Sequence, residues 1–254
     1  MITASQVNDL RQRTGISMMA CKKALEEAGG DEEKAIDILR KKGAAKAAEK
    51  ADRLMKEGKV IIKTAPGIGV LVKILCETDF VSKNEEFLKI GEKAAETALK
   101  KGMEAAKTEA DAALKNLFTK LGENMGIEIE VLKGDNVETY LHTNERVGTL
   151  VSLRNKDKEK GRDVAMHITA MRPSVVRPED VKEDVVIKER EIWKEQLKNE
   201  KKPEAIWDKI MMGKEKKFRE EMALLKQTFV KDANKTIEQF LGDNTVEKFI
   251  RMGL

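Results

Sequence analysis

The hydrophobic pattern of this chain changes period near residue 58, and this change limits the possible folds more than any other feature. Before it, apolar residues recur at intervals of three and four, as in Met18, Cys21 and Leu25, which is typical of helices that bury one face. After it, segments 60–64 and 68–74 place apolar residues at alternate positions on either side of a Pro-Gly turn, which predicts a β-hairpin. Separate blocks of the two periods indicate an α+β protein with antiparallel sheets.

Composition narrows the class of protein further. Charged residues make up 37% of the chain and aromatic residues only 4%, which favours helices with solvated charged faces and argues against a base-stacking platform for single-stranded nucleic acid. Lys and Arg number 49 against 45 Asp and Glu, and the two signs are interleaved. The net charge of +4 therefore gives no dedicated surface for nucleic acid, and we expect no specific nucleic-acid partner.

The cysteines and histidines do not suggest a metal site or a cofactor. The two cysteines, Cys21 and Cys76, are 55 positions apart, and the two histidines are His142 and His167, so no familiar zinc-ligand spacing occurs. We expect reduced, largely buried thiols. The first residues lack a basic stretch followed by an apolar run, and no apolar segment reaches 18 residues. These features predict a cytoplasmic protein that does not span a membrane.

The first fifty residues read as three short helices. Thr3 and Gln6 form a capping box for the first, the second runs over about 17–28, and the third starts after Asp31 and ends at Gly43. This unit, residues 1–50, resembles the ubiquitin-associated domain type. The alanine- and charge-rich stretch that follows predicts a helical linker up to residue 57.

The remainder divides into two predicted subdomains, 58–134 and 135–254. Helices are expected at about 84–101, 108–121 and 158–171, and strands at 127–132, 137–142 and 147–153, so that helices cover one face of each antiparallel sheet. Segment 228–254 reads as a strand, a helix and a strand that return to the second sheet.

Residues 186–226 interrupt the second subdomain. They include 12 basic and 9 acidic residues among 41 positions, and their apolar residues, with both tryptophans of the chain, keep heptad-like intervals. A narrow apolar seam between charged flanks predicts an antiparallel coiled-coil hairpin. Exposed aromatic residues on such a seam favour self-association, and a hairpin that packs on its own sheet and leaves a monomer is the alternative.

Five segments, in order along the chain, together resemble the bacterial elongation factor Ts family. They are RTGISMMACKKAL (13–25), ETDFVSKNEEF (77–87), GENMGIEIEVL with YLHTNERVGTLV (122–151), VAMHITAMRP (164–173) and KPEAIWDKIMMGKEKKF (202–218). The resemblance implies a guanine nucleotide exchange factor that acts on the GDP-bound form of elongation factor Tu and has no catalytic chemistry of its own. It also implies that GDP release persists until GTP binds.

The resemblance assigns roles to nine residues. Asp79 and Phe80 are expected to press against the GTPase and displace the elements that hold Mg²⁺, while Thr78 and Val81 shape their loop. His142 is expected to reach the phosphate-binding region of the partner. The N-terminal domain is expected to contact the partner through Arg11, Met18, Met19 and Lys22.

Five of these residues have a plainer interpretation on the sequence alone. Phe80 fits a core position and Asp79 a helix cap, while His142 and the two methionines fit structural roles. His167, among apolar neighbours, reads as structural in either case. Two other protein classes also remain: an adaptor that binds through residues 1–45, and a ribosome- or RNA-binding accessory factor.

Overall fold

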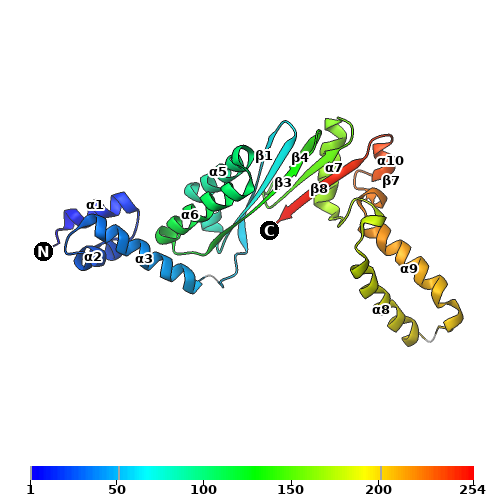
Figure 1. The fold of residues 1–254 in the computed structure, drawn as a ribbon, viewed down its shortest axis with the longest axis horizontal. Helices are drawn as coiled ribbons and strands as arrows, with labels where there is room; N and C mark the ends of the chain where they lie inside the picture. Colours follow the sequence, from blue (N-terminus) through cyan, green and yellow to red (C-terminus); the bar gives the residue numbers. More distant parts are fainter. Residues whose placement is uncertain (1, 51, 201) are drawn as a thin grey trace.

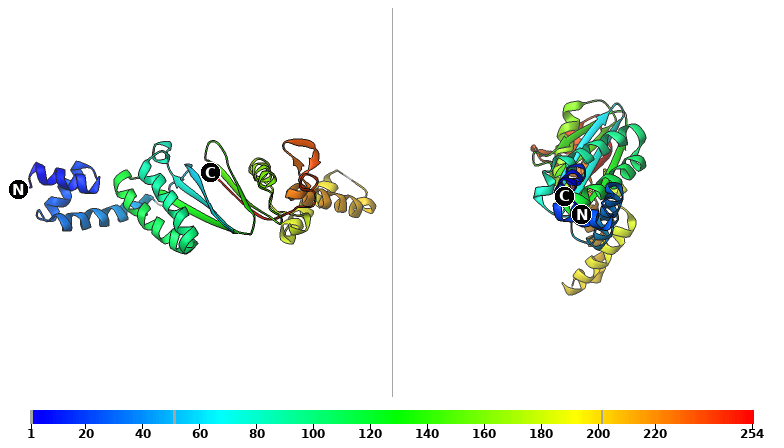
Figure 2. Two further views of the ribbon diagram at one scale, coloured as in Figure 1. Left: turned by 90° about the horizontal axis from the view of Figure 1, so that it is seen from above. Right: turned by 90° about the vertical axis from the view of Figure 1, so that its left-hand side faces the viewer.

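The structure, a computed structural model, describes residues 2–50, 52–200 and 202–254. Three parts follow one another along the long axis of an extended molecule (Figures 1 and 2). A small helical domain lies at the N-terminal end, two sheets with their helices lie in the middle, and a helical hairpin projects at the other end. The predicted α+β class, with its N-terminal helices and inserted hairpin, is confirmed.

The helical domain contains α1 (Ala4–Thr14), α2 (Met18–Glu27) and α3 (Glu32–Lys50). The predicted capping box at the start of α1 is present. The predicted end of the third helix at Gly43 is wrong, because α3 continues to Lys50. A Cβ at residue 43 would lie 2.2 Å from Cγ2 of Thr119, so this glycine permits a close approach of α3 to another helix. The predicted helical linker is likewise too long, since residues 52–56 form a turn and irregular backbone; residue 51 lies outside the described residues.

The first sheet has the antiparallel order β1-β2-β3, and helices cover one of its faces. Apolar side chains of β2 and β3 pack against this helical layer around Phe87, which is fully buried. The helix α6 begins at residue 103, five residues before the predicted start. The elements are β1 (Glu57–Ala65), β2 (Ile68–Cys76), α4 (Asp79–Ser82), α5 (Glu85–Lys101), α6 (Met103–Leu121) and β3 (Met125–Lys133).

The second sheet has the antiparallel order β4-β5-β8, so the last strand of the chain returns to it as predicted. Its outer face packs against α7, α10 and the small β6–β7 hairpin around Ile168 and Leu224. The elements are β4 (Val137–Leu141), β5 (Val147–Leu153), α7 (Lys158–Met171), β6 (Thr228–Phe229), β7 (Asp232–Thr236), α10 (Ile237–Leu241) and β8 (Val246–Gly253).

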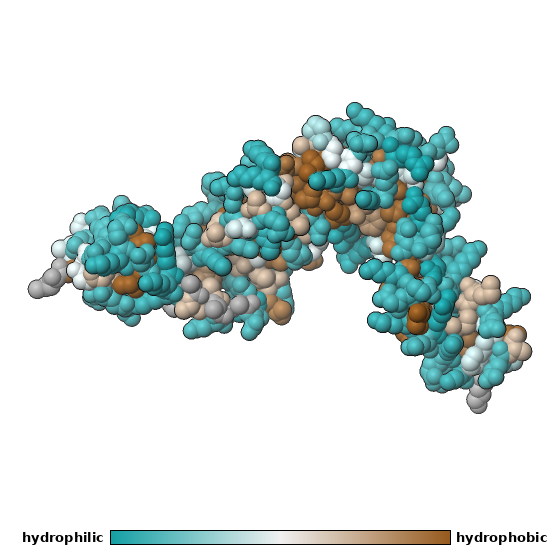
Figure 3. Space-filling model, viewed as in Figure 1, coloured by the Kyte–Doolittle hydropathy of each residue, from teal (hydrophilic) through white to brown (hydrophobic). Residues whose placement is uncertain are grey.

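The two sheets pack face to face, which makes the middle of the molecule a four-layer arrangement of helices, sheet, sheet and helices. Val60, Leu71 and Leu132 of the first sheet meet Leu150 and Met252 of the second in one buried cluster. Figure 3 shows apolar surface gathered at the middle of the molecule, where these sheets meet. Burial of both inner faces holds the two subdomains together through this cluster, which lies between the separate cores of the two sheets.

The projecting hairpin consists of α8 (Glu183–Asn199) and α9 (Trp207–Met222). Trp193 is buried and meets the ring of Phe218 edge-on, with centroids 5.6 Å apart. Leu225, which the heptad pattern places on the seam, packs instead in the core of the second sheet. No helix among the residues that the structure describes is long and apolar enough to cross a membrane.

Candidate functional site

Helix α4 holds an exposed phenylalanine next to a buried valine. Phe80 is 82% exposed, whereas the next residue, Val81, is 6% exposed and packs in the core of the first sheet. The hydroxyl of Ser82 donates to the carbonyl oxygen of Asp79 at 2.8 Å and closes the turn. The predicted loop is therefore a four-residue helix, which directs one apolar ring outward while its neighbour anchors the turn.

Two glutamates that the sequence analysis did not single out hold this helix at its N-terminal side. Glu123 accepts hydrogen bonds from the backbone N–H of Thr78 at 3.1 Å and from its hydroxyl at 2.7 Å. Glu77 in turn accepts from the backbone N–H of Asn124 at 2.7 Å. These reciprocal bonds, called here the Glu77–Glu123 clamp, tie the end of β2 to the start of β3. In the sequence, only the family resemblance of segments 77–87 and 122–151, which contain these two glutamates, pointed to this region.

Two titratable features lie near Phe80, an ion pair at α4 and a buried thiol at the end of β2. Lys83 donates to the carboxylate of Asp79 at 2.8 Å, and this hydrogen bond lowers the pKa of Asp79. Burial, with a smaller effect from the charge of Glu123, raises the pKa of the Cys76 thiol to about 12. Asp79 is therefore an exposed carboxylate at neutral pH, and Cys76 stays a protonated structural thiol.

His142 lies on an exposed loop, residues 142–146, called here the His142 loop. Its Nδ1 lies 3.2 Å from the hydroxyl of Tyr140. The backbone N–H of Val60 donates to the carbonyl oxygen of Glu145 at 2.7 Å, which attaches the loop to strand β1 of the other sheet. Glu145 has a φ of 55°, a left-handed conformation that is uncommon for a residue with a side chain.

The structure brings α4 and the His142 loop to the same end of the core. Cys76, the last residue of β2, pairs with Glu57, the first residue of β1. Helix α4 begins three residues after Cys76, and the side chain of Arg146 in the His142 loop bonds to Glu57. Phe80 and His142 are therefore presented from the same end of the core, although 62 positions separate them in the chain.

The third predicted group is not part of this cluster. Arg11, Met18, Met19 and Lys22 are all exposed, with exposed fractions of 51% and 63% for the two methionines. They belong to α1 and α2, which lie at the end of the molecule away from the sheets (Figure 1). Both methionines face solvent, so the core interpretation of this pair is wrong. A partner that touched this group together with Phe80 would have to span both domains.

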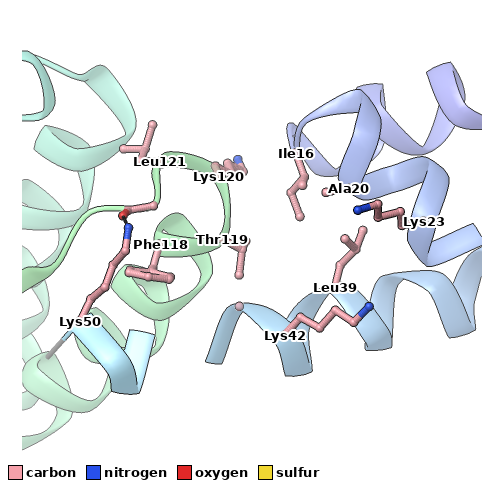
Figure 4. Close-up of a pocket in the computed structure, with 12 residues that line it drawn as sticks. Ile16, Ala20, Lys23, Leu39, Lys42, Lys50, Phe118, Thr119, Lys120 and Leu121 are labelled. Atoms are coloured by element: carbon pink, nitrogen blue, oxygen red, sulfur yellow. Dashed lines mark hydrogen bonds between the residues drawn. The ribbon is translucent and has the colours of Figure 1, made fainter. Parts of the chain in front are cut away.

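A cleft of about 380 Å³ separates the helical domain from the end of α6 (Figure 4). Apolar side chains and lysine stems line it, among them Ile16, Leu39 and Phe118. Lys50 crosses the junction and donates to the carbonyl oxygen of Gly122 at 2.6 Å. The cleft is the seam between two domains, and its lining of alkyl chains and amines favours packing over acid–base chemistry.

His167 has the structural role that the sequence predicts. It is fully buried, its Nδ1 accepts from the backbone N–H of Val230 at 3.2 Å, and its Nε2 lies 3.1 Å from Oε1 of Gln227. Burial lowers the pKa of His167. Within the described parts of the chain, no three His, Cys, Asp or Glu residues are grouped so that they could hold a metal ion.

Comparison with known proteins assigns the chain to a family. Residues 77–254 match the family model described as elongation factor TS. An elongation factor Ts of Pasteurella multocida is 45% identical over 98% of this chain and 90% of its own length, and one of Shewanella amazonensis is 43% identical over 99% and 90%. A third, from Tolumonas auensis, is 42% identical over 98% and 90%. The resemblance noted in the sequence is thereby confirmed, and the chain belongs to the elongation factor Ts family of translation elongation factors.

Proposed function

We propose that this protein is a guanine nucleotide exchange factor for elongation factor Tu and binds its GDP-bound form. The observation that carries the proposal is Phe80, an aromatic ring held outward by a helix turn whose next residue is buried. Aromatic side chains presented in this way are typical anchors of protein interfaces, and burial of one ring contributes roughly 1.5–3 kcal/mol. The membership of the elongation factor Ts family supports the choice of partner.

The proposed mechanism is conformational. Phe80 and Asp79 press on the GTPase and displace the elements that hold Mg²⁺, which weakens the neutralisation of the nucleotide phosphates. His142 acts on the phosphate-binding region from the same end of the core. GDP then leaves, and GTP binding ends the complex, because a protein that lowers the affinity of its partner for nucleotide must itself be weakened by nucleotide. No step requires an acid, a base or a nucleophile on this chain, so the protein is no enzyme in the chemical sense.

The two remaining surfaces have proposed roles of their own. Arg11, Met18, Met19 and Lys22 on the helical domain contact the partner separately from the cluster at Phe80. The hairpin carries apolar side chains that lie open to solvent, and Met212 is 74% exposed. We propose that this hairpin pairs with that of a second copy to form a homodimer.

Release of labelled GDP from purified elongation factor Tu tests the function. The wild-type protein is expected to accelerate release, and the double variant Asp79→Ala/Phe80→Ala at least about tenfold less, equal to about 1.4 kcal/mol of barrier. Val230→Ala removes another exposed apolar side chain, 48% exposed and remote from α4, and serves as the matched control. A wild-type protein that leaves GDP release unchanged would refute the function, and a fully active double variant would refute the role of α4.

A further inference from the structure

We propose that the ion pair between Arg146 and Glu57 is a strap that fixes the His142 loop against strand β1. The strap sets the position of His142 relative to Phe80 before any partner binds. Both residues are positioning residues: they act through the loop and need not touch the GTPase. The inference rests on the proposed function in one respect, namely the use of the two elements by a common partner.

Arg146 joins three segments that are distant in the chain. Its guanidinium bonds to the carboxylate of Glu57 and donates to the carbonyl oxygen of Lys56 at 3.1 Å. Its own carbonyl oxygen accepts from the backbone N–H of Leu254 at 3.0 Å, and its backbone N–H donates to Oδ1 of Asn144 at 3.0 Å. One residue thus connects the loop to the start of β1 and to the last strand.

Glu57 lies between the two elements that the strap would coordinate. It pairs with Cys76 in the β1–β2 ladder, and Cys76 lies two residues before Thr78, the N-cap of α4. The hydrogen bond that Lys83 donates to the carboxylate of Asp79 is the main cause that raises the pKa of Lys83, and the negative charge of Glu57 adds a smaller effect. The charge of Glu57 thus acts on Lys83, the partner of Asp79, as well as on Arg146.

The His142 loop depends on such external contacts. Residues 142–144 are exposed, and the loop has one internal backbone bond, from the N–H of Glu145 to the carbonyl oxygen of His142 at 2.8 Å, among the described contacts. A loose loop would lose conformational freedom on binding, at about 1–2 kcal/mol for each backbone residue fixed. Together with the ion pair of Lys59 and Glu145 and the backbone bond from Val60 to Glu145, the strap makes part of that loss before binding. Such preorganisation raises the rate of a step that needs both elements at once.

The first test is independent of any partner. Hydrogen exchange of the Glu145 amide in the isolated protein should be at least about tenfold faster in Arg146→Ala, because the turn would open more often. Thermal stability should change little, since both side chains are partly exposed and such pairs contribute little to folding. If the amide exchanges at the wild-type rate in a folded variant, the loop does not need the strap and the proposal fails.

The second test measures GDP release from elongation factor Tu over a full titration. Arg146→Ala and Glu57→Ala should each lower the maximal rate about tenfold and change the half-saturating concentration less than about threefold. The double variant should be no slower than either single one, and the exchanged pair Arg146→Glu/Glu57→Arg should recover most of the rate. Losses that multiply in the double variant would mean independent partner contacts and would overturn the strap.

Two further variants keep the result interpretable. Lys63→Ala removes a similarly exposed ion pair on the same strand, with Glu96 at 3.1 Å, and should keep the wild-type rate. Glu57→Gln preserves the side-chain shape if an alanine variant fails to fold, and it should show the same faster amide exchange. A wild-type protein without exchange activity would refute the proposed function alone, because the amide measurement would still decide the strap.

Discussion

At the scale of single residues, Phe80 and Val81 are neighbours whose substitutions should have opposite consequences. Phe80 is almost fully exposed, so Phe80→Ala should change the free energy of unfolding by less than about 0.5 kcal/mol. Val81 is buried, and Val81→Ala should cost about 2 kcal/mol through lost burial and a small cavity. Urea unfolding of both variants measures this contrast. A large loss of stability in Phe80→Ala would show that the ring packs in the core and would contradict its exposed position.

His167 predicts a dependence of stability on pH. Its folded-state pKa lies below the ordinary value of 6.5, because burial disfavours the charged ring. As the pH falls below 6.5 the unfolded chain takes up the proton first, so stability is complete above 6.5 and decreases toward the lower folded-state pKa. Urea unfolding between pH 7.5 and about 5 should show this slope. The His167→Gln variant should lack the part of the slope that His167 contributes. An equal slope in both proteins would show that His167 is not its source.

At the scale of elements, the Glu77–Glu123 clamp should keep α4 in place. Glu123→Ala leaves the N–H and hydroxyl of Thr78 without the carboxylate that accepts both bonds. We expect faster hydrogen exchange over residues 78–84 and slower GDP release, with Phe80 itself unchanged. Glu130→Ala, which removes another exposed carboxylate of β3, is the matched control. A Glu123→Ala protein with native amide protection would show that Val81 anchors the helix alone.

The sequence predicted those elements that local patterns define. Alternation gave the β1–β2 hairpin, and Thr3 gave the start of α1. The prediction of a helix end at Gly43 is wrong, because glycine occurs both after the ends of helices and where two backbones approach closely. Here it allows the close contact with Thr119 inside a continuous helix. The partners of Glu123 and Arg146 lie 45 and 89 positions away, so no local pattern reveals them. Face-to-face packing of the sheets escaped prediction for the same reason.

At the scale of the whole molecule, the arrangement of parts separates three candidate contact surfaces. The helical domain and the hairpin lie at opposite ends, with the two sheets and their helices between them (Figure 1). The cluster at Phe80 belongs to the middle part, where the two sheets share a buried cluster between them. A partner of the hairpin could therefore bind without covering the helical domain, so assembly and exchange should be separable by mutation.

The base of the hairpin determines where it can be cut. Arg190 on α8 donates to Glu215 on α9 at 2.8 Å, and Arg219 bonds to both Glu183 and Glu215, so the two helices are held together there. Residues 222–225 also bond to 174–176 and pack in the core. Replacement of all of 186–226 would therefore damage the second sheet. Replacement of residues 191–214 by a short Gly/Ser linker should leave the base and the core intact.

The shortened protein tests the proposed dimer. It lacks the exposed Ile192, Ile206 and Met212, so the apolar surface proposed for pairing would be lost. Light scattering at several concentrations should show a dimer for the wild-type protein and a monomer for the shortened one, and GDP release should stay within about threefold because α4 and the His142 loop are untouched. Met212→Lys changes a single residue and leaves the hairpin at its full length, and it should also weaken the dimer. If a folded, shortened protein no longer accelerates GDP release, then the hairpin acts on the GTPase directly.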